Sequence, residues 1–374
     1  MEPIRVLQIV TIMNRGGLET MLMNYYRHID RDRVQFDFLT HRQEKGDYDD
    51  EILRMGGRIF NTCPINPFYF RKYLVDLRWF FSTHRTYNII HSHIDSLSTF
   101  PLHAGKNAGI PIRIARSHTT GFNRDIKIPF RYLSKAFLPS AATHYWGCSK
   151  SAVSFLFGKK TILQCDYRII KNAIESEKFA YNIKKRITTR KNLNVENNIV
   201  FGHVGHFTFP KNHSFLIKVF KKIHEKEKNA ILLLAGDGEE KAKIMNMVRK
   251  LGLGDSIKFL GVQSNISDLM QAMDVFLLTS FFEGFSIVLV EAQAAGLPIL
   301  ASDVVTDEVA ITNLVKFFSL NNSVEEWADV ALSLRHSKRV DTSAELKASG
   351  YDIVSESKNL ENLYLKLTGK SLRD

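Results

Sequence analysis

The stretch FFEGFSIVLVEAQAAGLPIL, residues 281–300, decides the fold. It is apolar apart from two carboxylates, Glu283 and Glu291, which stand eight residues apart. Eight residues are a little over two helical turns, so two acids at this spacing on one helix share a face. A carboxylate in apolar surroundings destabilises a protein unless it is hydrogen-bonded. The pattern therefore predicts a ligand rich in hydroxyl groups near these acids.

Short β-rich runs alternate with helical stretches along the whole chain. The predicted strands are residues 5–10, 34–40, 88–93, 112–118, 144–149 and 167–172, and then 199–205, 230–236, 256–261, 274–280, 298–302 and 314–319. Strands separated by helices form parallel sheets with helices on both faces. We therefore predict an α/β fold of two Rossmann-like, doubly wound domains that face each other across a cleft.

The predicted domains are residues 1–171 and 172–355, with their boundary in the polar region 170–198. The last predicted helix, 356–374, is amphipathic and has no strand after it, so we expect it to pack back on the first domain. Ligands of doubly wound sheets bind outside the carboxyl ends of the strands. The residues that follow each strand are therefore the candidates for a site.

Composition limits the class of protein. Three scattered cysteines indicate reduced thiols in a cytosolic protein. No apolar run approaches the roughly 20 residues that cross a bilayer, and the N-terminus reads as a strand rather than a signal peptide. We therefore expect a cytoplasmic protein.

The basic charge is concentrated in one half of the chain. Residues 1–171 carry 25 Lys+Arg against 14 Asp+Glu, whereas residues 172–374 carry 26 against 25. This asymmetry indicates an anionic partner for the first half: nucleic acid, an anionic membrane surface or a phosphorylated substrate. A merely soluble basic surface is the alternative. Nucleic acid is disfavoured because no recognition helix or interleaved aromatic and basic motif is evident.

Candidate ligand-binding residues follow the first and fourth predicted strands. Gly16 and Gly17 precede a helix, where a glycine backbone can approach a ligand and a helix N-terminus favours anions. His118 ends the fourth strand, although a lone histidine is more often structural. The nearby His91 and His93 share a strand face, but no third ligand makes them a metal site.

Further candidates lie in the second half. His206 and Lys211 occupy a loop between a strand and a helix, where lysine is a good phosphate ligand. Gly284 permits a tight turn that directs Glu283 toward the cleft, and the helix that starts at 285–289 offers free N–H groups to a phosphate. A nucleotide sugar suits this set, since its ribose and its hexose would each meet one carboxylate. A solvated acid and a helix-capping acid are the alternative.

These motifs resemble glycosyltransferase family 4, a large retaining family with the GT-B fold. The match consists of EGFSIVLVE with AAGLPILAS, while NRGGLETMLMNYYRHID, FDFLTH with GDYDDEI, SHTTGFN and VGHFTFPKNH resemble its bacterial capsular and exopolysaccharide branch. The resemblance covers nearly the whole chain. It implies a hexosyltransferase that uses a nucleoside-diphosphate sugar, most simply a UDP-sugar, without a metal ion or other cofactor.

The resemblance also implies roles for individual residues. Glu291 would hold the ribose, Glu283 the hydroxyls of the donor sugar, and Lys211 the diphosphate. Gly17 would approach the diphosphate from the opposite domain, and His118 would lie by the donor sugar at the reacting face. The remaining expected contacts are the backbone N–H groups of Phe285, Ser286 and Ile287 with sugar and phosphates, and Val262 with the base.

One departure and two alternatives qualify this interpretation. The family usually has arginine where this chain has His206, and histidine lacks the fork of donors and changes charge with pH. A non-catalytic nucleotide-sugar sensor on the same fold is therefore an alternative. Asp47-Tyr48-Asp49 matches the D-x-D motif of metal-dependent GT-A enzymes, but it directly precedes a predicted helix, where acids favour the first turn.

The expected partners are a nucleotide-sugar donor and a glycan or lipid-diphosphate-linked acceptor. The segment FYFRKYLVDLRWFF, residues 68–81, alternates aromatic and basic residues with a helical period. Such a helix suits peripheral docking on the inner face of the plasma membrane. An ordinary helix that packs its aromatic rings on the first domain is the alternative.

Overall fold

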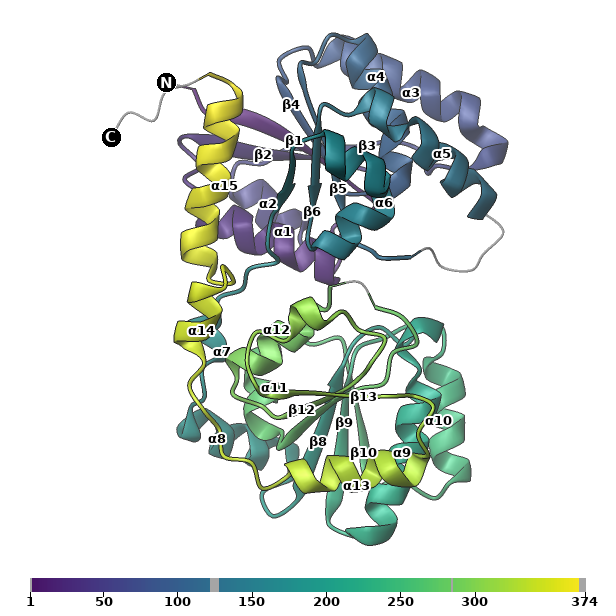
Figure 1. The fold of residues 1–374 in the computed structure, drawn as a ribbon, viewed down its shortest axis with the longest axis vertical. Helices are drawn as coiled ribbons and strands as arrows, with labels where there is room; N and C mark the ends of the chain where they lie inside the picture. The colour runs from purple at the N-terminus through teal and green to yellow at the C-terminus, as the bar shows by residue number, and fades with distance from the viewer. Residues whose placement is uncertain (1, 122–127, 284, 370–374) are drawn as a thin grey trace. The chain divides into compact units, whose positions relative to one another are not determined.

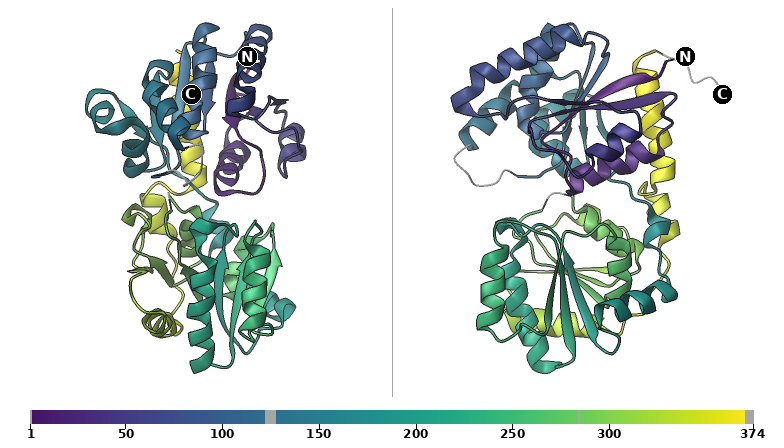
Figure 2. Two further views of the ribbon diagram at one scale, coloured as in Figure 1. Left: turned by 90° about the vertical axis from the view of Figure 1, so that its right-hand side faces the viewer. Right: turned by 180° about the vertical axis from the view of Figure 1, so that it is seen from behind.

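The computed structural model describes residues 2–121, 128–283 and 285–369 (Figure 1). The chain divides into two compact units: unit 1 comprises residues 1–173 and 353–374, and unit 2 comprises residues 174–352. Each unit is a parallel sheet covered by helices, as Figure 2 shows from two further directions. This confirms the predicted α/β fold of two Rossmann-like domains. Within the described residues, no helix is long and apolar enough to cross a membrane.

Unit 1 is built on a sheet with the strand order β3-β2-β1-β4-β5-β6-β7 in its described residues. The strands are β1 (Ile4–Val10), β2 (Val34–Thr40), β3 (Ile59–Asn61), β4 (Ile89–Ser92), β5 (Ile112–Ser117), β6 (His144–Gly147) and β7 (Tyr167–Ile169). The helices are α1 (Gly17–His28), α2 (Asp49–Arg54), η1 (Pro67–Tyr69), α3 (Phe70–Thr83), η2 (Asp95–Ser98), α4 (Thr99–Asn107), α5 (Ile128–Ala141), α6 (Lys150–Gln164) and α15 (Ile353–Leu367).

Unit 2 repeats this plan with the order β10-β9-β8-β11-β12-β13 in its described residues. The strands are β8 (Ile199–Val204), β9 (Ala230–Ala235), β10 (Ile257–Gly261), β11 (Val275–Leu278), β12 (Ile299–Ser302) and β13 (Val315–Phe318). The helices are α7 (Ser176–Phe179), α8 (Ile183–Leu193), η3 (Phe209–Lys211), α9 (His213–Lys226), α10 (Lys241–Lys250), α11 (Ile266–Ala272), α12 (Ile287–Ala294), η4 (Asp307–Val309), α13 (Val324–Leu334) and α14 (Ser343–Ala348).

Each predicted strand is present, with its ends within three residues of the prediction, and the structure adds β3. β3 was missed because three residues are too few to show a period. The polar region 170–198, in which the domain boundary is predicted, contains α7 and α8, and the Arg186 guanidinium of α8 donates to Asp274 of unit 2. Ion pairs of this kind hold α8, whereas α7 buries the Phe179 side chain.

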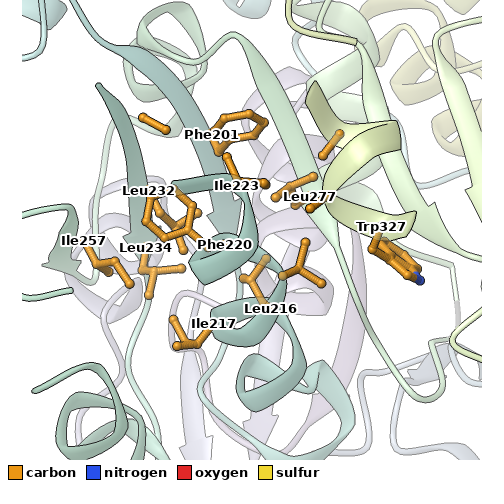
Figure 3. Close-up of a cluster of buried hydrophobic side chains, with 14 of the residues drawn as sticks. Phe201, Leu216, Ile217, Phe220, Ile223, Leu232, Leu234, Ile257, Leu277 and Trp327 are labelled. Carbon is orange, nitrogen blue, oxygen red and sulfur yellow. The ribbon is translucent and has the colours of Figure 1, made fainter. Parts of the chain in front are cut away.

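The core of unit 2 lies between its sheet and helices α9, α10 and α13 (Figure 3). Phe201, Leu232 and Leu277 project from the strands, and Phe220 and Trp327 meet them from the helices. The indole N–H of Trp327 donates to the Ser319 carbonyl at 2.9 Å, so this large side chain is buried without an unpaired donor. This packing fixes the strands whose ends carry the candidate donor residues.

The two faces of the unit 1 sheet differ in polarity. Side chains alternate between faces along a strand, and one face of β1, β4 and β5 buries Leu7, Ile90 and Ala115 in the cluster that includes α3 to α6. The opposite face, toward α1 and α15, buries Gln8, His91 and Arg116. Figure 1 shows α15 (yellow) running beside α1 and the strands of unit 1. Val6, Phe36 and Ile89 lie on this same face, so the C-terminal helix covers a mixed surface in which polar groups are buried among apolar ones.

Candidate functional site

Both sheets have a topological switch point. The strand order reverses between β1 and β4 in unit 1 and between β8 and β11 in unit 2. Connections on the two sides of such a point diverge and leave a crevice at the carboxyl ends of the strands, where doubly wound proteins bind their ligands. The loops after β1, β4, β8 and β11 carry most of the predicted site residues. The topology thus places the candidates where a ligand is expected.

Lys211 and Glu283 meet at the switch point of unit 2. Lys211 ends η3 in the loop after β8, and Glu283 lies in the loop after β11. The Lys211 Nζ atom lies 2.5 Å from Glu283 Oε2, and Ser280 Oγ donates to the same oxygen at 3.2 Å. Both side chains are less than one-fifth exposed, at 18% and 17%. The predicted phosphate ligand and the predicted sugar ligand are therefore direct neighbours, although 72 residues separate them.

Glu291 is the other carboxylate of the opening stretch. It lies on α12 and is 8% exposed. Burial raises its pKa to about 8, and the more distant positive charge of Lys178 opposes the shift. The described part of the chain supplies no hydrogen bond to this carboxyl group. A buried and unbonded carboxyl group is costly and indicates an absent partner.

The N-terminus of α12 begins two residues later than predicted. Phe285 and Ser286 precede the helix, whose first residue is Ile287. No side chain of the described residues caps this end, so the first backbone N–H groups stay open to an anion. The Phe285 ring stacks on Tyr351 with centroids 5.5 Å apart, which holds the turn in place. Gly284, predicted to allow that turn, lies outside the described residues.

Glu283 and Glu291 therefore do not share a helix face, since only Glu291 stands on α12. The argument from helical spacing does not apply to Glu283, because this residue precedes the helix. Both acids nevertheless belong to the segment that connects β11 to β12. Glu283 lies at the switch point, and Glu291 is buried on the helix.

The loops after β8 and β9 pack closely together. A Cβ atom at Gly236 would lie 2.1 Å from the Gly205 carbonyl oxygen, so this contact requires glycine. His206 is exposed, and its Nδ1 lies 3.4 Å from the Asp237 carbonyl oxygen. Val262, just after β10, is 53% exposed. Its expected contact with a base stays a prediction.

The predicted glycine turn of unit 1 is present. Gly16 is the N-cap residue of α1 and Gly17 its first residue, and no side chain of the described residues caps this helix. Asp47 and Asp49 of the D-x-D sequence have local roles: Asp47 Oδ2 accepts from Arg15 N at 3.0 Å, and Asp49 Oδ2 accepts from Gly46 N at 2.9 Å. Asp49 also opens α2, which supports the helix-start interpretation of this motif.

His118 follows β5 and is partly exposed. Its Nε2 lies 3.0 Å from Nδ1 of His93, and its backbone N–H donates to Asp95 Oδ1 at 3.0 Å. Burial lowers the pKa of both histidines well below the usual value and raises that of Asp95 to about 7. The structure thus joins His118 to His93, which sequence analysis considered only as a metal ligand.

Sequence analysis also missed an exposed aromatic pair beside the Lys211–Glu283 pair. The rings of Phe209 and Phe281 stack with centroids 5.1 Å apart and are 59% and 42% exposed. The Phe281 N–H donates to the Pro210 carbonyl at 2.8 Å, so the loops after β8 and β11 are tied together. The signal available in the sequence was the FF run before Glu283, which is too apolar for an exposed loop.

Comparisons with known proteins agree with this architecture. The family model "Glycosyl transferases group 1" matches residues 184–352. "Putative glycosyltransferase EpsF" of Bacillus subtilis (strain 168) is 35% identical over 372 residues, which cover 96% of each chain. "UDP-Gal:alpha-D-GlcNAc-diphosphoundecaprenol alpha-1,3-galactosyltransferase" of Escherichia coli is 23% identical and covers 75% of this chain and 76% of its own.

A solved structure shows the same fold. "Crystal structure of Anabaena Alr3699/HepE in complex with UDP-glucose" superposes with a TM-score of 0.79 at 18% identity, over 97% of this chain and 99% of that chain. The likeness extends over both Rossmann-like units and identifies the GT-B architecture. Together with the full-length sequence relative, it shows that the chain belongs to the glycosyl transferases group 1 family.

Proposed function

We propose that this glycosyltransferase moves a hexose from a UDP-sugar to a hydroxyl of a glycan or lipid-diphosphate-linked acceptor, with retention of configuration. The resemblance to the capsular and exopolysaccharide branch places the reaction in the synthesis of such a polymer. The E. coli relative, by its name, takes UDP-Gal and a diphosphoundecaprenol-linked sugar. The Anabaena structure, by its title, holds UDP-glucose. Both support a UDP-sugar donor.

The observation that carries this proposal is the polar set around α12. It combines a cation, Lys211, with two carboxyl groups, Glu283 and Glu291, and an uncapped helix N-terminus. A nucleotide sugar offers a diphosphate for the cation and the helix, and hydroxyl donors for both acids. An inorganic phosphate supports this proposal less well, because it lacks the several hydroxyl groups that could donate to both acids.

The chemistry follows from the same groups. When the bond between the anomeric carbon and the diphosphate breaks, negative charge grows on the leaving oxygen. Lys211 and the first N–H groups of α12 stabilise that charge, which is the main catalytic contribution that preorganised dipoles make. His118 and Glu283 hold the hexose at the reacting face. The proposed step uses no bound metal ion. The acceptor binds to the first domain, residues 1–171.

A turnover assay tests the proposal. Purified protein is incubated with UDP-hexoses and with simple glycan or lipid-diphosphate acceptors, and UDP release and product mass are measured. We expect acceptor-dependent turnover of at least one donor without added metal. The presence of His206 is the best support for the alternative, a non-catalytic nucleotide-sugar sensor. Donor binding without turnover, both in the parent and in His206→Arg, would favour that alternative. Product of inverted configuration would overturn the retaining assignment.

Unit 1 exposes a basic aromatic surface that suits a lipid-linked acceptor. It consists of Phe68, Tyr69, Arg71, Lys72, Val75, Arg78 and Trp79 from η1 and α3, and of Tyr132, Leu133 and Phe137 from α5. The inner face of α3 buries Tyr73, Leu77, Phe80 and Phe81. The Phe70 ring of α3 contacts Phe130 of α5, with centroids 5.7 Å apart. Some aromatic rings of this segment therefore form core, while others stand outward among cations.

We propose that this basic aromatic surface docks on an anionic membrane. Trp79, at 66% exposed, and Phe68, at 91%, would enter the headgroup layer, and each cation near it contributes about 1 kcal/mol. Arg71→Glu with Lys72→Glu should reduce co-sedimentation with anionic vesicles by roughly tenfold or more at low salt. The matched control, Lys191→Glu with Lys250→Glu in unit 2, makes the same charge change on exposed residues and should sediment like the parent. Equal binding to neutral and anionic vesicles, or equal loss in both variants, would contradict docking through this surface.

A further inference from the structure

A chain of buried polar side chains runs through unit 1 and ends at His118. His93 Nδ1 lies 3.0 Å from His118 Nε2, and His93 Nε2 lies 2.8 Å from Gln8 Oε1. Gln8 Nε2 lies 3.4 Å from the Tyr364 hydroxyl, and that hydroxyl lies 2.7 Å from His91 Nδ1. Gln8, His91, His93 and Tyr364 are each at most 2% exposed. Only His118 reaches a partly exposed position at the strand ends.

This chain of hydrogen-bonded side chains joins elements that are remote in sequence. Gln8 and His91 are register partners on β1 and β4, and Tyr364 comes from α15. Gln8 and Tyr364 are 356 residues apart. A hydrogen-bonded link of this length between a sheet and a terminal helix puts the stability of the core at risk. If one hydrogen bond is broken, buried polar groups are left without partners, which costs free energy of folding. Apolar residues at these positions would have packed without that risk.

With the Gln8 amide oriented as in this structure, Oε1 toward His93 and Nε2 toward Tyr364, the hydrogen bonds allow one proton arrangement. An amide oxygen only accepts, so the His93 proton must sit on Nε2, where it is donated to Gln8 Oε1. A neutral His93 then has a lone pair at Nδ1, and His118 must donate its Nε2–H to it. At the other end, the Tyr364 hydroxyl accepts from Gln8 Nε2 and donates to His91 Nδ1. Each bond fixes the direction of the next one.

The surroundings keep the three histidines neutral. Burial lowers the pKa of His91, His93 and His118 well below the usual value. The fully buried guanidinium of Arg116 adds repulsion, and the groups to which it donates are uncharged: the Ile170 carbonyl, Asn172 Oδ1 and Met21 Sδ. A second proton on any of these rings is therefore disfavoured. A neutral imidazole ring can take either of two tautomers, and the hydrogen bonds to the neighbouring side chains decide which one forms.

We propose that His93, Gln8 and Tyr364 are positioning residues that hold His118 in the neutral Nε2–H tautomer, with Nδ1 presented as a hydrogen-bond acceptor. A sugar hydroxyl is the donor that this acceptor fits. This last step rests on the proposed function, whereas the tautomer does not. The C-terminal helix thereby acts on the reacting face through Tyr364. Among these hydrogen bonds Tyr364 has no direct contact with His118, so its effect passes through Gln8 and His93.

Selective ¹⁵N labelling of histidine tests the tautomer without any substrate. The His118 resonances, assigned by their loss in His118→Asn, should show a protonated Nε2 and an unprotonated Nδ1. Tyr364→Phe removes one hydroxyl, and it should shift the His118 ring toward a mixture of tautomers. Tyr25→Phe is the matched control: its hydroxyl donates to the Lys171 carbonyl at 2.7 Å, outside the chain. It should leave the His118 resonances unchanged.

Kinetics supply the second readout. We expect Tyr364→Phe to lower kcat roughly tenfold with KM within about twofold, and Tyr25→Phe to leave kcat unchanged. A His118 ring protonated at Nδ1, or resonances equal in parent and Tyr364→Phe, would overturn the proposal. The expected tautomer with no turnover of any donor would instead count against the proposed function alone. If both tyrosine variants lose the same thermal stability and the His118 tautomer does not change, the hydrogen-bonded side chains serve only to stabilise the fold, and the proposal is wrong.

Discussion

Replacement of Glu291 by glutamine should stabilise the ligand-free protein increasingly as pH rises from about 5 to 8, and it should weaken the binding of UDP. The first effect follows from burial, which raises the Glu291 pKa from 4.5 to about 8. Between these values the folded protein retains a proton that the unfolded chain has released, so the free energy of unfolding falls as pH rises. At about 1.4 kcal/mol per pKa unit, the penalty at pH 9 is on the order of 5 kcal/mol. Glutamine does not titrate and escapes it.

The second effect has the opposite sign. A carboxylate that accepts from ribose hydroxyls contributes roughly 1.5–3 kcal/mol per charged hydrogen bond, so UDP affinity should fall about tenfold or more in Glu291→Gln. Urea unfolding at pH 5, 7 and 9 measures the first effect, and calorimetric titration with UDP the second. The stability difference should be small near pH 5 and largest at pH 9. A gain in stability with unchanged UDP affinity would show that Glu291 is a structural carboxylate only.

Glu326→Gln is the matched control. Glu326 is exposed and forms a capping box with Ser323 at the start of α13, and these hydrogen bonds lower its pKa. Stability gained from its ionised form is present above the usual carboxyl pKa and is lost as pH falls. Glu326→Gln should therefore bring no gain at pH 9 and no change in UDP binding. The contrast separates the effect of the buried site from that of removing any glutamate.

The fold was predictable because its signals are local. Strands such as β9, AILLLA, are continuous apolar runs bounded by turn residues, and this pattern survives in any tertiary setting. The rule that ligands bind at the carboxyl ends of the strands then pointed to Lys211 and Glu283. Their direct ion pair was not predicted, because it depends on how the loops after β8 and β11 turn toward each other. The late start of α12 has the same cause, since helix ends respond to the turn before them.

The polar chain behind His118 was beyond sequence reasoning for a different reason. Gln8 stands inside the apolar run IRVLQIV, where a polar residue reads as an outward-facing position of a strand. His91 and His93 were noticed as a pair, but their partners, Gln8 and Tyr364, come from the two ends of the chain. Only the register of β1 with β4 and the docking of α15 bring the four together. Buried polar pairing is a tertiary property that residue spacing does not encode.

Removal of the Glu283 side chain should separate the binding of UDP from the binding of a UDP-sugar. Glu283 Oε2 holds Lys211 Nζ at 2.5 Å in this structure. A diphosphate that recruits Lys211 must compete with this carboxylate, whereas an intact donor also brings hydroxyls that engage Glu283. Glu283→Ala should therefore bind UDP as tightly as the parent or more tightly. Its kcat/KM for the sugar nucleotide should fall roughly 10- to 100-fold, the effect of a lost charged hydrogen bond.

Lys211→Ala should give the complementary result. It removes the phosphate ligand and leaves the largely buried Glu283 carboxylate facing an anionic ligand, so UDP affinity and turnover should both fall, each by at least tenfold. In the double variant the carboxylate no longer repels the diphosphate, and UDP affinity should recover part of the loss. Lys218→Ala, an exposed lysine on the neighbouring α9, controls for the loss of positive charge and should behave as the parent. Additive losses of UDP affinity in the double variant would show that the two side chains do not compete with a ligand, and that their ion pair only ties the loops after β8 and β11 together.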